Sequence, residues 1–115
     1  MSPLLHPLLR QVGLPVSPQL ANLEVRSISC DSRRVGPGTV FVGLPGTRVD
    51  GGQFWPDVLA AGACAAVISP AAAAAVPPGA DDAVIVAQEP MALVAGRLSA
   101  EFWQQPSQQI GRAHV

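Results

Sequence analysis

The sequence of 115 residues contains no lysine and no tyrosine, and charged residues make up only 13% of it. A net charge of −1 provides no long-range attraction for nucleic acid or for an anionic membrane surface, so neither is expected as a partner. Without lysine the chain cannot form the Gly-Lys-Ser/Thr phosphate loop, and it has no Gly-x-Gly-x-x-Gly motif after a strand. We therefore expect this chain itself to bind neither ATP nor a dinucleotide.

Reactive and metal-binding side chains are also scarce. The two cysteines, Cys30 and Cys64, form neither a Cys-x-x-Cys pair nor a cluster with histidine, which argues against zinc and against a disulfide framework. Each lies in or beside an apolar segment without a nearby histidine, so neither is expected to be a catalytic nucleophile. Prolines interrupt the apolar runs, and neither a signal peptide nor a membrane span is predicted. These features are typical of a cytoplasmic protein.

Hydrophobic residues make up 49% of the chain, enough for one folded domain of this length. The spacing of apolar residues predicts helices over residues 3–12, 53–61 and 90–105, and strands over residues 24–30, 39–42, 65–69 and 83–87. The last two helices have predicted buried stripes, formed by Phe54, Val58 and Leu59 and by Met91, Val94, Leu98 and Phe102. Residues 70–82 are expected to be a surface connection, because a short helix between prolines is costly to nucleate. This order predicts an α/β fold with a small mixed or parallel sheet flanked by helices.

Two polar loops follow consecutive predicted strands. The first, residues 31–34, places an acidic side chain, a hydroxyl and two arginines at a strand end. The second, residues 44–52, is rich in glycine, whose backbone N–H groups an anion can approach. On spacing alone the first loop is equally consistent with a plain turn, and the second with a helix start capped by Asp50.

A series of motifs resembles the amino-terminal domain of bacterial Mur ligases: Asp31-Ser-Arg33, Pro37-Gly38, Val40-Phe-Val42, Leu44-Pro-Gly-Thr-Arg-Val-Asp-Gly51 and Gly62-Ala-Cys-Ala-Ala-Val-Ile68. The resemblance covers residues 27–109. Within the family it is most similar to the ligases that add the third residue of the peptidoglycan stem, meso-diaminopimelate or lysine. The loop over residues 44–51 and the ending Phe102-Trp-Gln-Gln-Pro-Ser107 favour these over the ligases that add D-alanyl-D-alanine.

The resemblance implies a UDP-sugar-binding domain over residues 1–109, whose substrate is UDP-N-acetylmuramoyl-L-alanyl-D-glutamate (UDP-MurNAc-L-Ala-D-Glu). The positions that match the family's contacts to the uridine diphosphate are Cys30, Ser32, Thr47, Arg48 and Val49. Cys30 departs from the larger apolar or threonine side chain expected there. The resemblance implies no catalytic residue and no metal ligand in this chain. ATP and Mg²⁺ would serve the full-length enzyme through the central ATP-binding domain of the same chain, and the fragment alone would be inactive.

The last six residues, 110–115, fit nothing upstream. They are the translation of ATC GGA AGA GCA CAC GTC, the start of a widely used sequencing adapter, so we expect a non-native tail there. Two other interpretations of the whole chain remain open. It could be a standalone nucleotide-sugar-binding module, or a structural α/β domain that meets a partner through its alanine-rich face.

Overall fold

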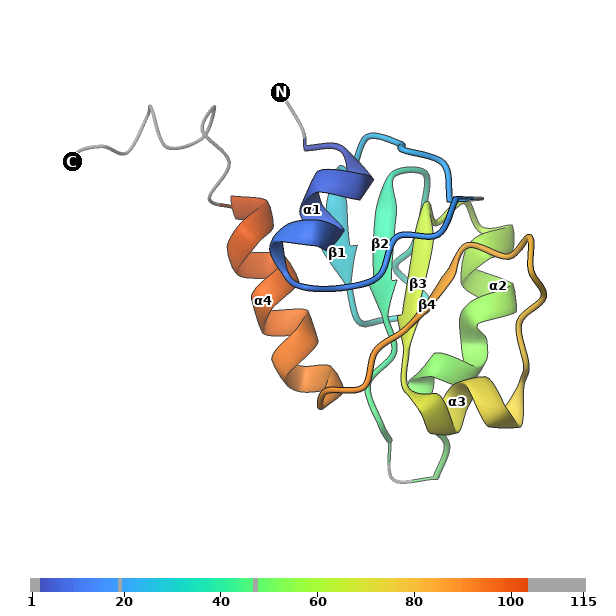
Figure 1. Ribbon diagram of the computed structural model, residues 1–115. Helices are drawn as coiled ribbons and strands as arrows, with labels where there is room; N and C mark the ends of the chain where they lie inside the picture. Colours follow the sequence, from blue (N-terminus) through green and yellow to red (C-terminus); the bar gives the residue numbers. More distant parts are fainter. Residues whose placement is uncertain (1–2, 19, 47, 104–115) are drawn as a thin grey trace.

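A computed structural model describes residues 3–18, 20–46 and 48–103 (Figure 1). Four strands form one sheet in the order β1-β2-β3-β4, with bounds Ser27–Ser29, Thr39–Val42, Ala65–Ile68 and Val84–Val86. Every strand pair in this sheet is parallel. The helices are α1 (Leu5–Gln11), the 3₁₀ helix η1 (Gly51–Phe54), α2 (Trp55–Ala60), α3 (Pro70–Ala75) and α4 (Met91–Trp103). The predicted α/β class with flanking helices is confirmed, whereas residues 104–105 of the last predicted helix and the tail at 110–115 lie outside the described residues.

Helices cover both faces of the sheet, α1 and α4 on one side and α2 and α3 on the other (Figure 1). The two central strands, β2 and β3, are buried along their whole length, as the apolar run over residues 65–69 indicates for β3. Alternate residues of each strand face opposite helix layers, so the core has two halves. One half contains Val40, Val42, Ala65 and Val67, and the other contains Phe41, Ala66 and Ile68.

The outer helices follow the expected patterns closely. In α4 the predicted stripe of Met91, Val94, Leu98 and Phe102 is buried. Helix α1 buries its leucines and ends before Gly13, whose φ of +80° is the left-handed conformation that closes helices at glycine.

The segment over residues 70–82 differs from the expectation, because its first part forms helix α3. The hydroxyl oxygen of Ser69 accepts a hydrogen bond from the backbone N–H of Ala72 at 3.1 Å and so caps the helix. Pro70 occupies the first turn, where its missing N–H costs nothing. Ala72 is fully buried on the face of the sheet that α2 and α3 cover. Capping and tertiary packing thus offset the nucleation cost on which the prediction was based.

The second helix also departs from its predicted stripe. It begins as the 3₁₀ helix η1, which has three residues per turn instead of 3.6. Because of this tighter winding, Phe54 does not lie on the same face as it would in an α-helix. Phe54 is 41% exposed, Val58 is buried and Leu59 is partly buried. Trp55, expected at the margin of the stripe, is instead buried and donates its indole N–H to the carbonyl of Val76 at 2.7 Å.

Candidate functional site

The two polar loops lie at the same edge of the sheet. Strands β1 and β2 are parallel neighbours, with Ser29 paired to Phe41, so the segments that leave their carboxyl ends begin side by side. The longer loop, after β2, projects from the lower edge of the sheet in Figure 1. In open α/β sheets, ligands bind outside the carboxyl ends of the strands. Both predicted site segments therefore start at the edge of the sheet where a ligand is expected.

Asp31 organises the loop after β1. One of its carboxylate oxygens accepts hydrogen bonds from the backbone N–H of Arg33 at 2.9 Å and from the Nε of the same residue at 3.2 Å. The second oxygen lies 3.7 Å from the Nε of Arg34. The backbone hydrogen bond from Arg33, followed by that from its side chain, holds the pKa of Asp31 below its usual value. Both arginine side chains remain more than 80% exposed, so this loop presents positive charge to solvent.

Cys30 and Ser32 flank that carboxylate. Cys30 is an exposed free thiol, and partial burial raises its pKa above the ordinary value. Ser32 is partly buried. Both predicted contact residues therefore have accessible surface on the loop, next to the exposed guanidinium groups.

The loop after β2 is a narrow reverse turn. Its two arms are joined by an antiparallel bridge between Pro45 and Asp50 and by a hydrogen bond of 3.1 Å from the N–H of Gly46 to the carbonyl of Val49. Arg48 and Val49 are exposed on this turn, and Arg48 is in none of the ion pairs formed among the described residues. Thr47, the remaining predicted contact, lies outside the described residues.

The backbone N–H groups of the glycines in this second loop are not open to an anion, contrary to the prediction. The three N–H groups expected to be open to an anion all donate within the protein: that of Gly46 to Val49, that of Gly51 to the carbonyl of Leu44 at 2.8 Å, and that of Gly52 to the Asp50 carboxylate at 2.8 Å. The expected backbone anion site is therefore wrong for these groups. The interpretation of Asp50 as a helix cap is confirmed.

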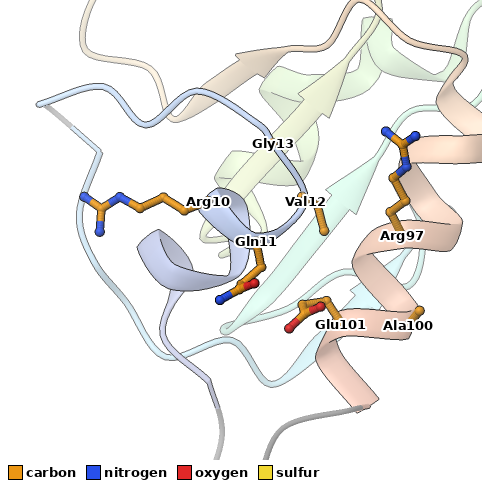
Figure 2. Close-up of a pocket in the computed structure, with 7 residues that line it drawn as sticks. All are labelled: Arg10, Gln11, Val12, Gly13, Arg97, Ala100 and Glu101. Atoms are coloured by element: carbon orange, nitrogen blue, oxygen red, sulfur yellow. The ribbon is translucent and has the colours of Figure 1, made fainter.

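Two hollows in the described part of the molecule lie away from the predicted site. One, of about 540 Å³, lies between the end of α1 and the outer side of α4, where Figure 2 shows the side chains of Arg10 and Arg97 pointing away from each other. The other, of about 310 Å³, lies at the amino edge of the sheet beside Gly38 and Cys64. Neither of these two hollows is lined by a predicted contact residue.

The described residues contain no group of three or more His, Cys, Asp or Glu side chains that could hold a metal ion. In the same part of the chain, no helix has the length and apolar character needed to cross a membrane.

Iodoacetamide is expected to alkylate Cys30 and to spare Cys64 in the native protein. Cys64 is buried, and this burial raises its pKa to about 11, so that very little of the reactive thiolate is present at pH 8. If the Cys30 side chain lines the nucleotide site, saturating UDP should slow its alkylation. Peptide mass mapping after timed alkylation measures both effects, with denatured protein, in which both thiols react, as the control. Equal rates of Cys30 alkylation with and without UDP would show that the Cys30 side chain is not part of the nucleotide site.

A parallel sheet with helices on both faces places this chain in the class of open α/β domains. Residues 24–103 match the family model described as "Mur ligase family, catalytic domain", and the chain belongs to the Mur ligase family. The resemblance of the sequence motifs to this family is thereby confirmed.

The chain is similar to curated proteins named UDP-N-acetylmuramoyl-L-alanyl-D-glutamate--2,6-diaminopimelate ligase. It is 60% identical over 93% of its length to that of Prochlorococcus marinus (strain MIT 9313), and 53% identical over 96% of its length to that of Synechococcus sp. (strain WH7803). It is 43% identical over 81% of its length to the ligase of Trichormus variabilis. The chain covers 21%, 22% and 18% of these relatives, so it spans about a fifth of their length.

Proposed function

We propose that this chain is the amino-terminal UDP-sugar-recognition domain, residues 1–109, of an ATP-dependent ligase of cytoplasmic peptidoglycan synthesis. The ligase adds the third stem residue to UDP-MurNAc-L-Ala-D-Glu. The names of the relatives support this substrate over that of the D-alanyl-D-alanine-adding ligases. The observation that carries the proposal is the placement of both candidate loops at the carboxyl edge of neighbouring parallel strands. We keep residues 110–115 outside the domain, as a non-native tail.

Side chains carry the proposed recognition of the uridine diphosphate, because the glycine N–H groups of the second loop are already bonded. The guanidinium of Arg48 is the group suited to the diphosphate, since its planar donors can bind two phosphate oxygens at once. Ser32 contributes a neutral hydrogen bond and Val49 an apolar contact. Thr47 and Cys30 complete the set of contacts.

ATP and Mg²⁺ belong to the full-length enzyme in this proposal. The residues of this chain do not fit them: it has no lysine for a phosphate loop, and its described residues have no cluster of metal-binding side chains. We therefore assign amide formation to the central ATP-binding domain and the rest of the ligase. This chain contributes binding energy that fixes one end of the substrate, so that the other end is presented to the reacting groups.

Calorimetric titration tests the proposal directly. UDP-MurNAc-L-Ala-D-Glu and UDP are expected to bind at one site on this chain, whereas ATP with Mg²⁺ is expected not to bind. With ATP, Mg²⁺, the UDP-sugar and meso-diaminopimelate together, neither phosphate release nor amide product is expected. Absence of UDP-sugar binding would contradict the recognition role. Amide product formed by the purified chain would contradict the assignment of amide formation to the rest of the ligase.

A further inference from the structure

We propose that Asp50 and Ser69 are positioning residues that hold Arg48 and Val49 in place for the nucleotide. This inference rests on the proposed function, since it concerns the same ligand. It goes beyond helix capping, because it assigns a second role to the Asp50 carboxylate: fixing the orientation of the β2 loop through its bond to Ser69.

The Asp50 carboxylate is bonded on both of its oxygens. One oxygen accepts a hydrogen bond of 2.8 Å from the backbone N–H of Gly52, and this bond caps η1. The other accepts the hydroxyl of Ser69 at 2.7 Å, nineteen residues further along the chain. The same hydroxyl oxygen accepts the N–H of Ala72 at 3.1 Å. One chain of hydrogen bonds thus joins the base of the β2 loop to the end of β3 and the start of α3.

This tether acts where the turn is fixed to the fold. Asp50 is paired with Pro45 at the base of the reverse turn and lies two residues from Arg48. The neighbouring N–H of Gly51 donates to the carbonyl of Leu44, so the two arms are locked to each other. Locked arms move as one body, and the bond from Asp50 to Ser69 then sets the direction in which the turn points from the sheet edge.

A cap and a positioning residue predict different results. A cap needs only the oxygen that binds Gly52, and its loss lowers stability without changing how the folded protein binds UDP. A tether also holds the guanidinium of Arg48 in its binding position. When the tether is removed, UDP must order this guanidinium on binding, and the entropy cost lowers the affinity. Affinity of the folded protein therefore separates the two roles.

The binding test uses UDP and variants of Ser69, measured well below each melting temperature. Ser69→Ala removes the tether, and Ser69→Asp keeps a good N-cap residue but places a second carboxylate against Asp50. Both are expected to weaken UDP binding about 5- to 10-fold, and Ser69→Thr, which keeps the hydroxyl, is expected to bind as the wild type does. Val94→Ala, a core truncation on the other face of the sheet, is the stability control and should leave affinity unchanged. Equal affinity in all folded variants would overturn the proposal.

Hydrogen exchange provides a second readout that needs no ligand. The amides of Gly46 and Gly51, which close the turn, are expected to exchange at least about tenfold faster in Ser69→Ala than in the wild type, while amides of β3 stay protected. Unchanged exchange at these two amides would overturn the tether even if the wild type bound no UDP. Failure of wild-type binding with faster exchange would instead contradict the proposed function and leave the tether standing.

Discussion

Replacing Gly43 by alanine is expected to lower the free energy of unfolding by about 3 kcal/mol, the upper part of the usual range for overpacking a core. Gly43 is buried at the end of β2, and a Cβ there would lie 2.3 Å from the Cα and 2.4 Å from the backbone N of Gly52. Both atoms belong to the backbone, so no side-chain rotation relieves the contact. The arms of the candidate loop would have to separate, which also disturbs the hydrogen bond from Gly43 to the carbonyl of Val67.

Gly96→Ala is the matched control for this prediction. Gly96 lies in the exposed part of α4, its φ is not positive, and an added Cβ meets nothing within 4 Å. Alanine there should raise stability by about 0.5–1 kcal/mol through helix propensity. Urea unfolding followed by circular dichroism measures both variants. A Gly43→Ala protein as stable as the wild type would show that the two arms are not in backbone contact.

Replacing Arg48 by alanine is expected to weaken binding of UDP-MurNAc-L-Ala-D-Glu roughly 10- to 150-fold. A hydrogen bond to a charged group contributes about 1.5–3 kcal/mol, and each 1.4 kcal/mol corresponds to a factor of ten in affinity. Ser32→Ala removes a neutral hydrogen bond and should cost only about 0.5–1.5 kcal/mol. Both variants should stay within about 0.5 kcal/mol of wild-type stability, because Arg48 is exposed and Ser32 lies on a surface loop.

Arg97→Ala is the control for the loss of positive charge. Arg97 is exposed on α4, beside the hollow between α1 and α4 (Figure 2) and away from the candidate loops. Its loss changes the net charge by the same amount and should leave affinity unchanged. If calorimetry gives equal affinities for the wild type and Arg48→Ala, or an equal loss for both arginine variants, Arg48 does not bind the diphosphate.

Much of this fold could be predicted from apolar spacing. Strand β3 is buried on both faces and is an apolar run in the sequence. The stripe of Met91, Val94, Leu98 and Phe102 repeats at helical spacing. Helix α3 was missed because its stability comes from elsewhere: the cap at Ser69, and the place that the rest of the fold provides for Ala72. Neither contribution can be read from a run of alanines between prolines.

In the candidate site, too, some features could be predicted from the sequence and others could not. The positions of the two loops follow from strand order, since parallel neighbours end at one edge. The role of the loop glycines does not follow from composition, because a glycine that admits a ligand and a glycine that admits another backbone look alike in sequence. A Cβ on Gly43 would meet the backbone of Gly52, and a Cβ on Gly52 would meet the side chains of Ala72 and Ile68. The bond from Asp50 to Ser69 spans nineteen residues, and no local pattern predicts it.

Backbone amide spectra recorded during a titration with UDP-MurNAc-L-Ala-D-Glu test the central claim most directly, because they locate the ligand on the chain. The account predicts saturable shifts concentrated in residues 30–32 and 47–49, which follow β1 and β2 in the sequence. Free UDP should reproduce them, and ATP should not. Shifts confined to the hollow between α1 and α4, or no shift in either loop segment at saturating ligand, would contradict the assignment of this edge as the UDP-sugar site.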